Sequence, residues 1–306
     1  MKKLCLTLVI VLLLVSICCG LDAKQVQSQN SNNSGSVTIP DFRKNPHQVD
    51  NFILVQGGTF QMGTPSGSSY SEPDEFPVHQ VTLSSFYICP HEVTQGEYIS
   101  IMDYNPSCFP QDMLFPVERV NWYNAIEYCN LLSRRNHYQP VYTYAGYGTN
   151  TKHWPHNWNT YYHNNIICDW SANGYRLPTE AEFEYAIRGG ANHDNYTYSG
   201  SNNLNEVGWY QGNTTQTHEV MTKAPNSLGI YDMTGNVWEW LWDWFENYTS
   251  APQTNPHGPD IAMYKDRRGG AWDGIYTYHR CTNRSYEHIM YGYWGMGFRV
   301  VRNAGE

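Results

Sequence analysis

The chain has 306 residues, enough for one large domain or two small ones, and 41% of them are apolar, so a buried core can form. Charged residues make up 15% and the formal net charge is −9, which argues against a nucleic-acid or anionic-lipid partner because such partners need a basic face. Aromatic residues are abundant, with 25 Tyr and 11 Trp, so contact surfaces are expected to rely on aromatic and amide groups.

Residues 1–19 have the pattern of a signal peptide. Lys2 and Lys3 precede an apolar run, Leu4 to Cys19, that is too short for a comfortable membrane span. The run ends in Cys18-Cys19-Gly20, and a Cys at this place resembles a bacterial lipoprotein signal, in which the Cys is lipidated and becomes the new N-terminus. Two alternatives follow: lipidation at Cys18 or Cys19, or simple cleavage that releases a soluble exported protein.

Residues 20–48 are rich in Gln, Ser, Asn and Gly, which is typical of a flexible tether. Behind a lipidated Cys, such a tether would hold the domain that follows, residues 49–303, away from a membrane surface. The expected location is therefore the bacterial cell envelope or periplasm, with membrane contact only through the lipid.

The folded part opens with strand patterns and continues with three helix starts. Short apolar or alternating runs predict strands at 52–55, 78–83 and 86–88. Thr94 and Glu97 form a capping-box pattern that predicts a helix from about Gln95, and Thr179 with Glu182 repeats it. Another helix is expected after Asn121, because apolar residues recur there at helical spacing.

The remaining segments lack helical periodicity. Residues 137–175 are rich in Tyr, Asn, Trp and His, and after Gly190 only short strands are expected, such as 297–301. The fold class is therefore α+β, with few helices, short strands and long loops. Loops of this length need buried aromatic residues or metal ions to hold them when disulfides are few.

The cysteines do not form a disulfide or metal framework. Five lie outside the signal segment, an odd number with wide spacing and no C-x-x-C pair: Cys89, Cys108, Cys129, Cys168 and Cys281. Clustered thiolate ligation of a metal is therefore not supported.

The segment DMTGNVWEWLWDW, residues 232–244, carries four tryptophans at alternate positions. In a strand these side chains share one face. The structural interpretation is a core stripe, because each aromatic side chain buries a large area and can hold a loop-rich domain together.

Seven segments taken together resemble the formylglycine-generating enzyme family, also called the sulfatase-modifying factor family. They occur in the family's order and cover residues 52 to 302: GGTFQMG, PVHQVTLSSFYICPHEVTQGEY, PVERVNWYNAIEYCNLLS, GYRLPTEAEFEYAIRGG, NSLGIYDMTGNVWEW, RGGAW and GFRVVR. The resemblance implies an elaborated C-type-lectin-like fold with little regular structure. It also implies that Trp238 lies by the substrate cleft.

The resemblance implies a structural calcium site at Asp232, Gly235, Val237 and Glu239, with two side chains and two backbone carbonyls as ligands. Calcium takes six to eight oxygen ligands and accepts backbone carbonyls. The alternative is that Asp232 caps a turn and Glu239 pairs with an arginine.

The family's copper chemistry is not expected in this chain. Family enzymes oxidise a cysteine of an unfolded sulfatase segment to formylglycine with two copper(I)-binding cysteines, and thiolate pairs suit that soft ion. Here those positions fall at Asp273 or Gly274 and among Tyr276 to Tyr278, where no Cys occurs. Cys281 and Cys129 match structural half-cystines whose partners are replaced by Ile187 and Val300, so both are expected to be buried thiols.

Other residues of the region give weak catalytic candidates: Asp273, His279 and Cys281. His279 with Asp273 could bind a harder metal or act as a base, although one His and one Asp form no specific constellation. The structural interpretation of His279 is a satisfied buried histidine.

The leading hypothesis is an exported, calcium-stabilised family member that lacks copper-dependent activity and binds an extended peptide or another envelope protein. The residues expected to line its cleft are Trp238, Trp272, Asp273, Tyr278 and Arg284. The alternatives are a metal-dependent oxidoreductase of the formylglycine-generating type with an altered active site, and a fully active oxidase, which the missing thiols disfavour.

Overall fold

The computed structural model describes residues 52–109, 112–155 and 165–305. The expected signal peptide, its lipidation candidates Cys18 and Cys19, and the tether lie outside the described residues. The described part belongs to one unit of the chain, Asn45–Glu306. Its mixture of few helices and many short strands confirms the predicted α+β class.

The three predicted helices are present, with the predicted caps. α3 (Gln95–Met102) and α5 (Glu180–Ile187) each begin with a complete capping box, formed by Thr94 with Glu97 and by Thr179 with Glu182. α4 (Trp122–Arg135) begins at Asn121, whose side chain accepts a hydrogen bond from the Asn124 N–H. These caps satisfy backbone N–H groups that a helix end leaves without partners.

The helical content after Gly190 differs from the prediction. α6 (Leu204–Val207) is one turn long and is capped by Asn203. Such a turn carries too few residues to show a helical period in the sequence. Single 3-10 turns also occur at η1 (Pro73–Glu75), η2 (Thr151–His153), η4 (Gly190–Asn192) and η5 (Tyr276–His279).

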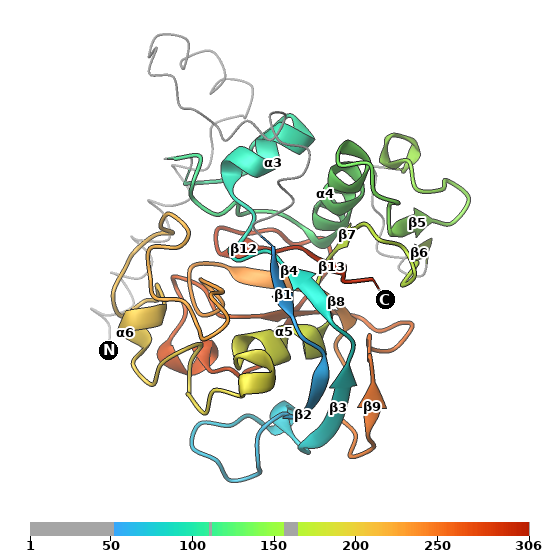
Figure 1. The fold of residues 1–306 in the computed structure, drawn as a ribbon. Helices are drawn as coiled ribbons and strands as arrows, with labels where there is room; N and C mark the ends of the chain where they lie inside the picture. Colours follow the sequence, from blue (N-terminus) through green and yellow to red (C-terminus); the bar gives the residue numbers. More distant parts are fainter. Residues whose placement is uncertain (1–51, 110–111, 156–164, 306) are drawn as a thin grey trace. The chain divides into compact units, whose positions relative to one another are not determined.

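Within the described residues, the strands form two four-stranded sheets and two smaller ones (Figure 1). The first sheet has the order β1 (Ile53–Val55), β4 (Phe86–Ile88), β13 (Val301–Asn303), β7 (Tyr175–Arg176), with antiparallel pairs throughout. The second has the order β11 (Ser285–Glu287), β10 (Lys265–Arg268), β8 (Trp238–Trp244), β12 (Met296–Gly297). The smaller sheets are β2 (Gly58–Met62), β3 (His79–Leu83), β9 (Gln253–Thr254), and β5 (Tyr142–Tyr144) with β6 (Ile166–Cys168).

The predicted strand at 297–301 is interrupted in the structure. β12 ends at Gly297 and β13 begins at Val301, so the two strands belong to different sheets. Between them, the carbonyls of Phe298 and Val300 accept hydrogen bonds from the backbone of Val93 and Cys89. The intervening Arg299 is fully buried, which places a charged side chain where the apolar pattern indicated continuous strand.

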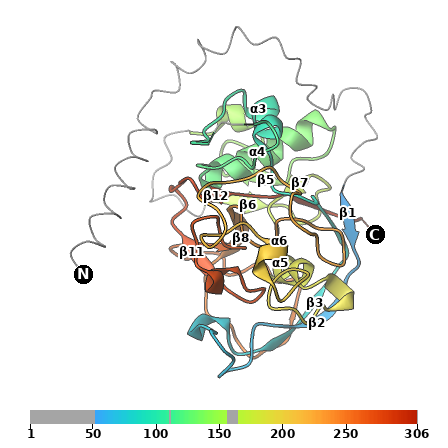
Figure 2. The same cartoon turned by 90° about the vertical axis from the view of Figure 1, so that its left-hand side faces the viewer.

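Strand β8 separates two apolar cores. Trp238, Trp240 and Trp244 belong to a core that includes α4, whereas Leu241 belongs to a second core with α5. This alternation confirms that the tryptophans share a face and that Trp240 and Trp244 are core residues. Both views place α3 and α4 together at one end and β2 and β3 at the opposite end (Figures 1 and 2).

Among the described residues, no helix combines the length and the apolar composition that a membrane span requires.

Candidate functional site

The segment after Gly269 and Gly270, to which the resemblance assigns the copper-binding cysteines, packs tightly against His279. Both glycines have positive φ angles, 95° and 80°. A Cβ at Gly270 would lie 2.6 Å from Cδ2 of His279, so only glycine fits against this ring. The next residue, Ala271, is fully buried, and Trp272 donates its backbone N–H to the carbonyl of Asn236.

Side chains from three segments meet beside this loop. The indole of Trp272 donates to the carbonyl of Trp294, and its ring meets Phe109 edge-on at 5.5 Å between centroids. The indole of Trp294 in turn donates to Asp273 Oδ2 at 3.3 Å. Both indoles are half-buried and Asp273 is exposed, so part of each ring and the carboxylate are accessible to solvent.

A second group extends the same surface. Tyr278 is 45% exposed, and its ring lies 6.2 Å from that of Trp238. The Arg267 guanidinium lies over the Trp238 ring, with 4.7 Å between its central carbon and the ring centroid. It also donates a hydrogen bond to the hydroxyl of Tyr293. The rings of Tyr293 and Trp294 lie 6.4 Å apart between centroids and link the two groups into one contact network. Its members, of which Trp238 is buried, are hereafter the Trp272 surface: Phe109, Trp238, Arg267, Trp272, Asp273, Tyr278, Tyr293 and Trp294. In the sheet that contains Trp238, β12 pairs with β8 directly and β10 lies between β8 and β11 (Figure 2).

Four of the five expected lining residues therefore come together, and Arg284 does not. Its guanidinium donates to both oxygens of Glu180, at 2.6 and 2.8 Å, and to the carbonyl of Asp74. It also stacks over Tyr248 at 3.8 Å. The side chain is buried, and all of these partners are distant from Arg284 in the sequence. This corrects the expectation for Arg284.

The catalytic candidates do not converge. Both ring nitrogens of His279 face backbone carbonyls, Nδ1 that of Ile275 at 2.9 Å and Nε2 that of Ala271 at 3.1 Å. Burial lowers the pKa of His279 to about 4, against the effect of these carbonyls. The ring is therefore held by the backbone, whereas Asp273 faces Trp294 and Cys281 faces the carbonyl of Ile187 at 3.9 Å.

Cys129 and Cys281 are buried free thiols, as predicted. Cys281 lies against Ile187, the residue at the position where the resemblance implies the family's second half-cystine. Burial raises the pKa of Cys281 to about 12, so its thiol stays protonated at neutral pH.

The residues expected to bind calcium form an ion-pair cluster. Both oxygens of Glu239 accept from Arg299, at 2.6 and 2.7 Å, and both side chains are fully buried. Asp232 Oδ2 accepts from the Met221 N–H. The sequence did not point to Glu92, which joins this cluster by accepting from the N–H of Val237 and the amide of Asn236.

As arranged, these residues do not fit the expected calcium ligand set, because Arg299 occupies both oxygens of Glu239. Among the residues that the structure describes, no group of three or more His, Cys, Asp or Glu is placed to hold a metal ion. The arrangement matches the alternative in which Glu239 pairs with an arginine. Burial, and to a lesser extent the negative charges of Asp232 and Glu239, raise the pKa of Glu92 well above its ordinary value. A proton on Glu92 therefore reduces the negative charge of the cluster.

The tryptophan array encloses a lysine rather than a ligand. The Lys265 ammonium lies 4.4, 4.5 and 4.0 Å from the ring centroids of Trp122, Trp242 and Trp244, and donates to the carbonyl of Trp242. Next to it, Asp243 accepts from the N–H of Glu180 at the start of α5. Of the two acids between the tryptophans, Asp243 thus links β8 to the start of α5, and Glu239 pairs with Arg299.

Sequence reasoning missed Arg267, Tyr293, Trp294 and Phe109. The run Tyr291-Gly-Tyr-Trp-Gly295 shortly before β13 was an available signal, since clustered aromatic and glycine residues in a loop suit a contact surface. Arg267 and Phe109 carried no comparable signal, because only the fold brings them to this place.

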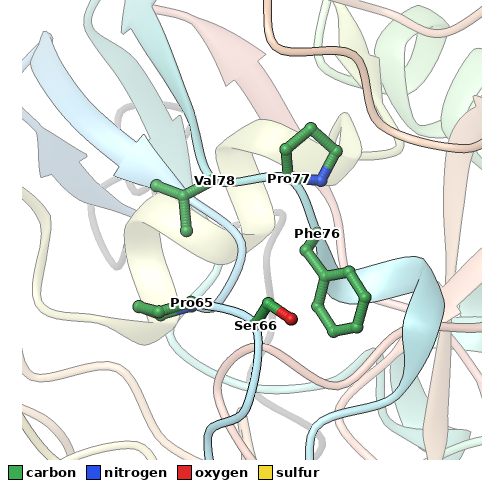
Figure 3. A pocket seen from close by; sticks show the side chains of 5 residues that line it. All are labelled: Pro65, Ser66, Phe76, Pro77 and Val78. Atoms are coloured by element: carbon green, nitrogen blue, oxygen red, sulfur yellow. The ribbon is translucent and has the colours of Figure 1, made fainter.

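A separate apolar hollow lies on the loops at the β2–β3 end. Pro65, Ser66, Phe76, Pro77 and Val78 line it, and their side chains surround it in Figure 3. None of its lining residues belongs to the Trp272 surface.

Comparison with known proteins places this geometry among related chains. A family model described as the sulfatase-modifying factor enzyme 1-like domain matches residues 38–304. The chaperone protein LppX of Paenibacillus barcinonensis is 37% identical over 281 residues, 86% of this chain and 87% of that protein. The formylglycine-generating enzyme of Mus musculus is 27% identical over 91% of this chain and 81% of its own length. The structure of Treponema denticola variable protein 1 superposes with a TM-score of 0.75 at 31% identity, covering 82% of this chain and 94% of that one.

Proposed function

Because this chain belongs to the family of sulfatase-modifying factor enzyme 1-like domains, we propose that it is an exported binding protein whose Trp272 surface holds an extended peptide. The carrying observation is the network of aromatic contacts that includes Tyr278, Trp272 and Trp294, at the place where the resemblance puts the family's substrate cleft. Rigid aromatic side chains give a large contact area at low entropic cost.

Two features favour a peptide as the ligand. The rings of Trp272, Trp294 and Tyr278 offer contacts for apolar side chains, while the exposed Asp273 carboxylate offers a hydrogen-bond acceptor to a peptide backbone. In addition, one relative carries the name chaperone protein, and a chaperone holds non-native polypeptide.

Copper-dependent formylglycine formation is not part of this proposal. The loop positions that correspond to the copper ligands hold Asp273, Gly274 and the Tyr276–Tyr278 segment. The altered-oxidoreductase alternative has less support, because His279 is held by two carbonyls and Cys281 lies against Ile187.

The binding test uses a fluorescent, permanently unfolded polypeptide, such as carboxymethylated α-lactalbumin, titrated with the purified domain. Trp272→Ala and Tyr278→Ala are expected to weaken binding at least about tenfold, each removing a hot-spot aromatic contact. Tyr147→Ala is the matched control, because Tyr147 is 47% exposed and lies in another loop. Equal binding by all four proteins would reject the surface.

The activity test incubates the domain with copper(I), oxygen and a Cys-x-Pro-x-Arg peptide. No formylglycine is expected, and product formed by this chain would overturn the binding-protein proposal.

Export and lipid anchoring are proposed from residues 1–48, with detergent-phase partition of the full chain as the measurement. Partition lost in a Cys18→Ala, Cys19→Ala double variant would support the anchor, whereas aqueous wild-type protein would favour simple cleavage.

A further inference from the structure

A buried asparagine joins the loop of Trp272 to the rest of the domain. Asn236 is fully buried and comes shortly before β8, with a φ angle of 62°. Its backbone carbonyl accepts a hydrogen bond from the Trp272 N–H at 2.9 Å, and its own N–H donates to the carbonyl of Trp209, also at 2.9 Å. Asn236 therefore holds the backbone of a residue whose indole belongs to the Trp272 surface.

The side-chain amide of Asn236 is bonded through both its oxygen and its nitrogen. Oδ1 accepts from the N–H of His218 at 3.0 Å, and Nδ2 donates to the carbonyl of the same residue at 3.2 Å. Nδ2 also donates to Glu92 Oε2 at 2.7 Å. A buried polar group that loses its partners costs stability, so these contacts fix the amide in one orientation.

The turn that carries Asn236 is left-handed at two successive residues. Gly235 has a φ angle of 89°, and a Cβ there would lie 2.4 Å from the carbonyl oxygen of Trp209, so only glycine fits. Asn adopts the left-handed conformation more readily than most other residues. In this conformation the Gly235 N–H bonds the carbonyl of Gly269, while the Asn236 carbonyl bonds Trp272. The turn thus holds the Gly269–Trp272 loop at both ends.

The segment on the other side of Asn236 is packed. The ring of Trp209 stacks on the ring of His218 at 3.7 Å between centroids, and the Lys223 ammonium lies 3.9 Å from the Trp209 ring centroid. The indole N–H of Trp209 donates to the hydroxyl of Thr222 at 3.0 Å. Since Asn236 bonds both stacked residues, it connects the Trp272 loop to a packed base.

We propose that Asn236 is a positioning residue of the Trp272 surface, because its amide holds the left-handed turn that fixes the backbone of Trp272. The effect on peptide binding rests on the proposed function, whereas the effect on the Trp272 backbone requires no ligand. Groups that are ordered before binding lose less entropy on binding. The Trp272 indole keeps its hydrogen bond to Trp294 when the amide is removed, so affinity is weakened rather than abolished.

The first test measures the Trp272 backbone without a ligand. Asn236→Gly removes the amide and leaves the left-handed conformation accessible. In the full chain, hydrogen exchange of the Trp272 N–H should become at least about tenfold faster, relative to the change at the N–H of Cys89, which bonds the distant Val300 carbonyl. An unchanged ratio of these two rates would overturn the proposal.

Asn226→Ala is the matched control, because it also removes a buried amide that is bonded through both its oxygen and its nitrogen. Nδ2 of Asn226 donates to the carbonyl of Ala186, and Oδ1 accepts from the N–H of Leu228. None of these residues belongs to the Trp272 surface. The variant should leave the exchange ratio at its wild-type value, and a change as large as that in Asn236→Gly would reduce the effect to general destabilisation.

The second test titrates carboxymethylated α-lactalbumin with the same proteins. Asn236→Gly should weaken binding about three- to tenfold, the cost of ordering a side chain on binding. Asn236→Ala should weaken it further, because a Cβ disfavours the left-handed conformation. Asn226→Ala should bind as wild type does, and a binding loss shared by this control would also overturn the proposal.

The binding results separate this inference from the proposed function. Wild-type affinity in Asn236→Gly, together with weakened binding by Trp272→Ala, would overturn the positioning role and leave the peptide-binding surface intact. Wild-type affinity in Trp272→Ala as well would reject the surface itself, and the exchange rate of the Trp272 N–H then decides the role of Asn236.

Discussion

The ammonium of Lys265 lies 4.0 Å from the ring centroid of Trp244 in the interior of the domain. Two further rings, of Trp122 and Trp242, lie within 4.5 Å of the same nitrogen. A cation over an indole face is stabilised by the ring quadrupole, and more strongly where water is excluded. Two of the four tryptophans of β8, Trp242 and Trp244, thus serve a structural purpose, because together with Trp122 they surround the buried Lys265 ammonium.

Lys265→Met should destabilise the domain by about 1–3 kcal/mol. The substitution keeps much of the apolar stem but removes the ammonium, its ring contacts and its hydrogen bond to the Trp242 carbonyl. Lys152→Met, at an exposed lysine, is the matched control and should change stability by less than about 0.5 kcal/mol. Guanidinium unfolding followed by tryptophan fluorescence measures both, and equal midpoints would contradict a stabilising cage.

The Glu239–Arg299 pair predicts a larger effect. Arg299→Met should cost about 3–5 kcal/mol, because it leaves the buried Glu239 carboxylate without its partner beside Glu92 and Asp232. Adding Glu239→Gln should recover part of the loss, since the remaining charge is then removed as well.

Arg134→Met is the control for this pair, because Arg134 is exposed and its guanidinium donates to the hydroxyl of Thr149. Urea unfolding of the single and double variants gives the coupling energy. A double variant no more stable than Arg299→Met would show that the Glu239 charge is not the cause.

Locally encoded features of this fold could be predicted from the sequence. The capping boxes at Thr94 and Thr179 lie within four residues of the helices they begin, and the alternation in β8 reports its two buried faces directly. Features that depend on distant segments could not be predicted. Arg284 lies next to the expected cleft in sequence, but its partner Glu180 is 104 positions away and directs it inward.

The site shows the same division. Trp272, Asp273 and Tyr278 were placed by the resemblance and do lie on one surface, whereas Phe109 and Arg267 reach it only through tertiary packing. The predicted calcium ligands Asp232 and Glu239 are both buried, but the sequence could not show that Arg299, 60 positions from Glu239, would occupy its oxygens.

That pairing makes a prediction about calcium. Thermal melting in excess EDTA and in millimolar CaCl₂ should agree within about 1 °C, because an ion that does not bind the native state cannot stabilise it. A calcium-dependent rise of several degrees that disappears in Glu239→Gln would contradict this expectation and would restore the ligand set Asp232, Gly235, Val237 and Glu239.

Glu118 predicts how stability depends on pH. Its carboxyl is fully buried; Oε1 accepts from the N–H groups of Cys108 and Phe109, and Oε2 has no hydrogen-bond partner within the described structure. Burial raises the pKa of Glu118 to about 7, against the effect of these two donors. The folded state therefore holds this proton more tightly than the unfolded chain, whose glutamate pKa is about 4.3. The contribution of Glu118 is fully present below that unfolded pKa and is lost as the pH rises toward 7.

Glu118→Gln should remove this dependence. Between pH 4.5 and pH 8 the wild-type domain should lose about 3 kcal/mol relative to the variant, the free energy that corresponds to a shift of about 2.5 pKa units. The glutamine can accept the same two N–H groups and carries no charge, so the comparison isolates ionisation. Glu219→Gln, at an exposed glutamate, is the control and should follow the wild-type curve. Urea unfolding across this pH range measures the difference, and parallel curves for wild type and Glu118→Gln would show that the buried carboxyl ionises at its ordinary pH.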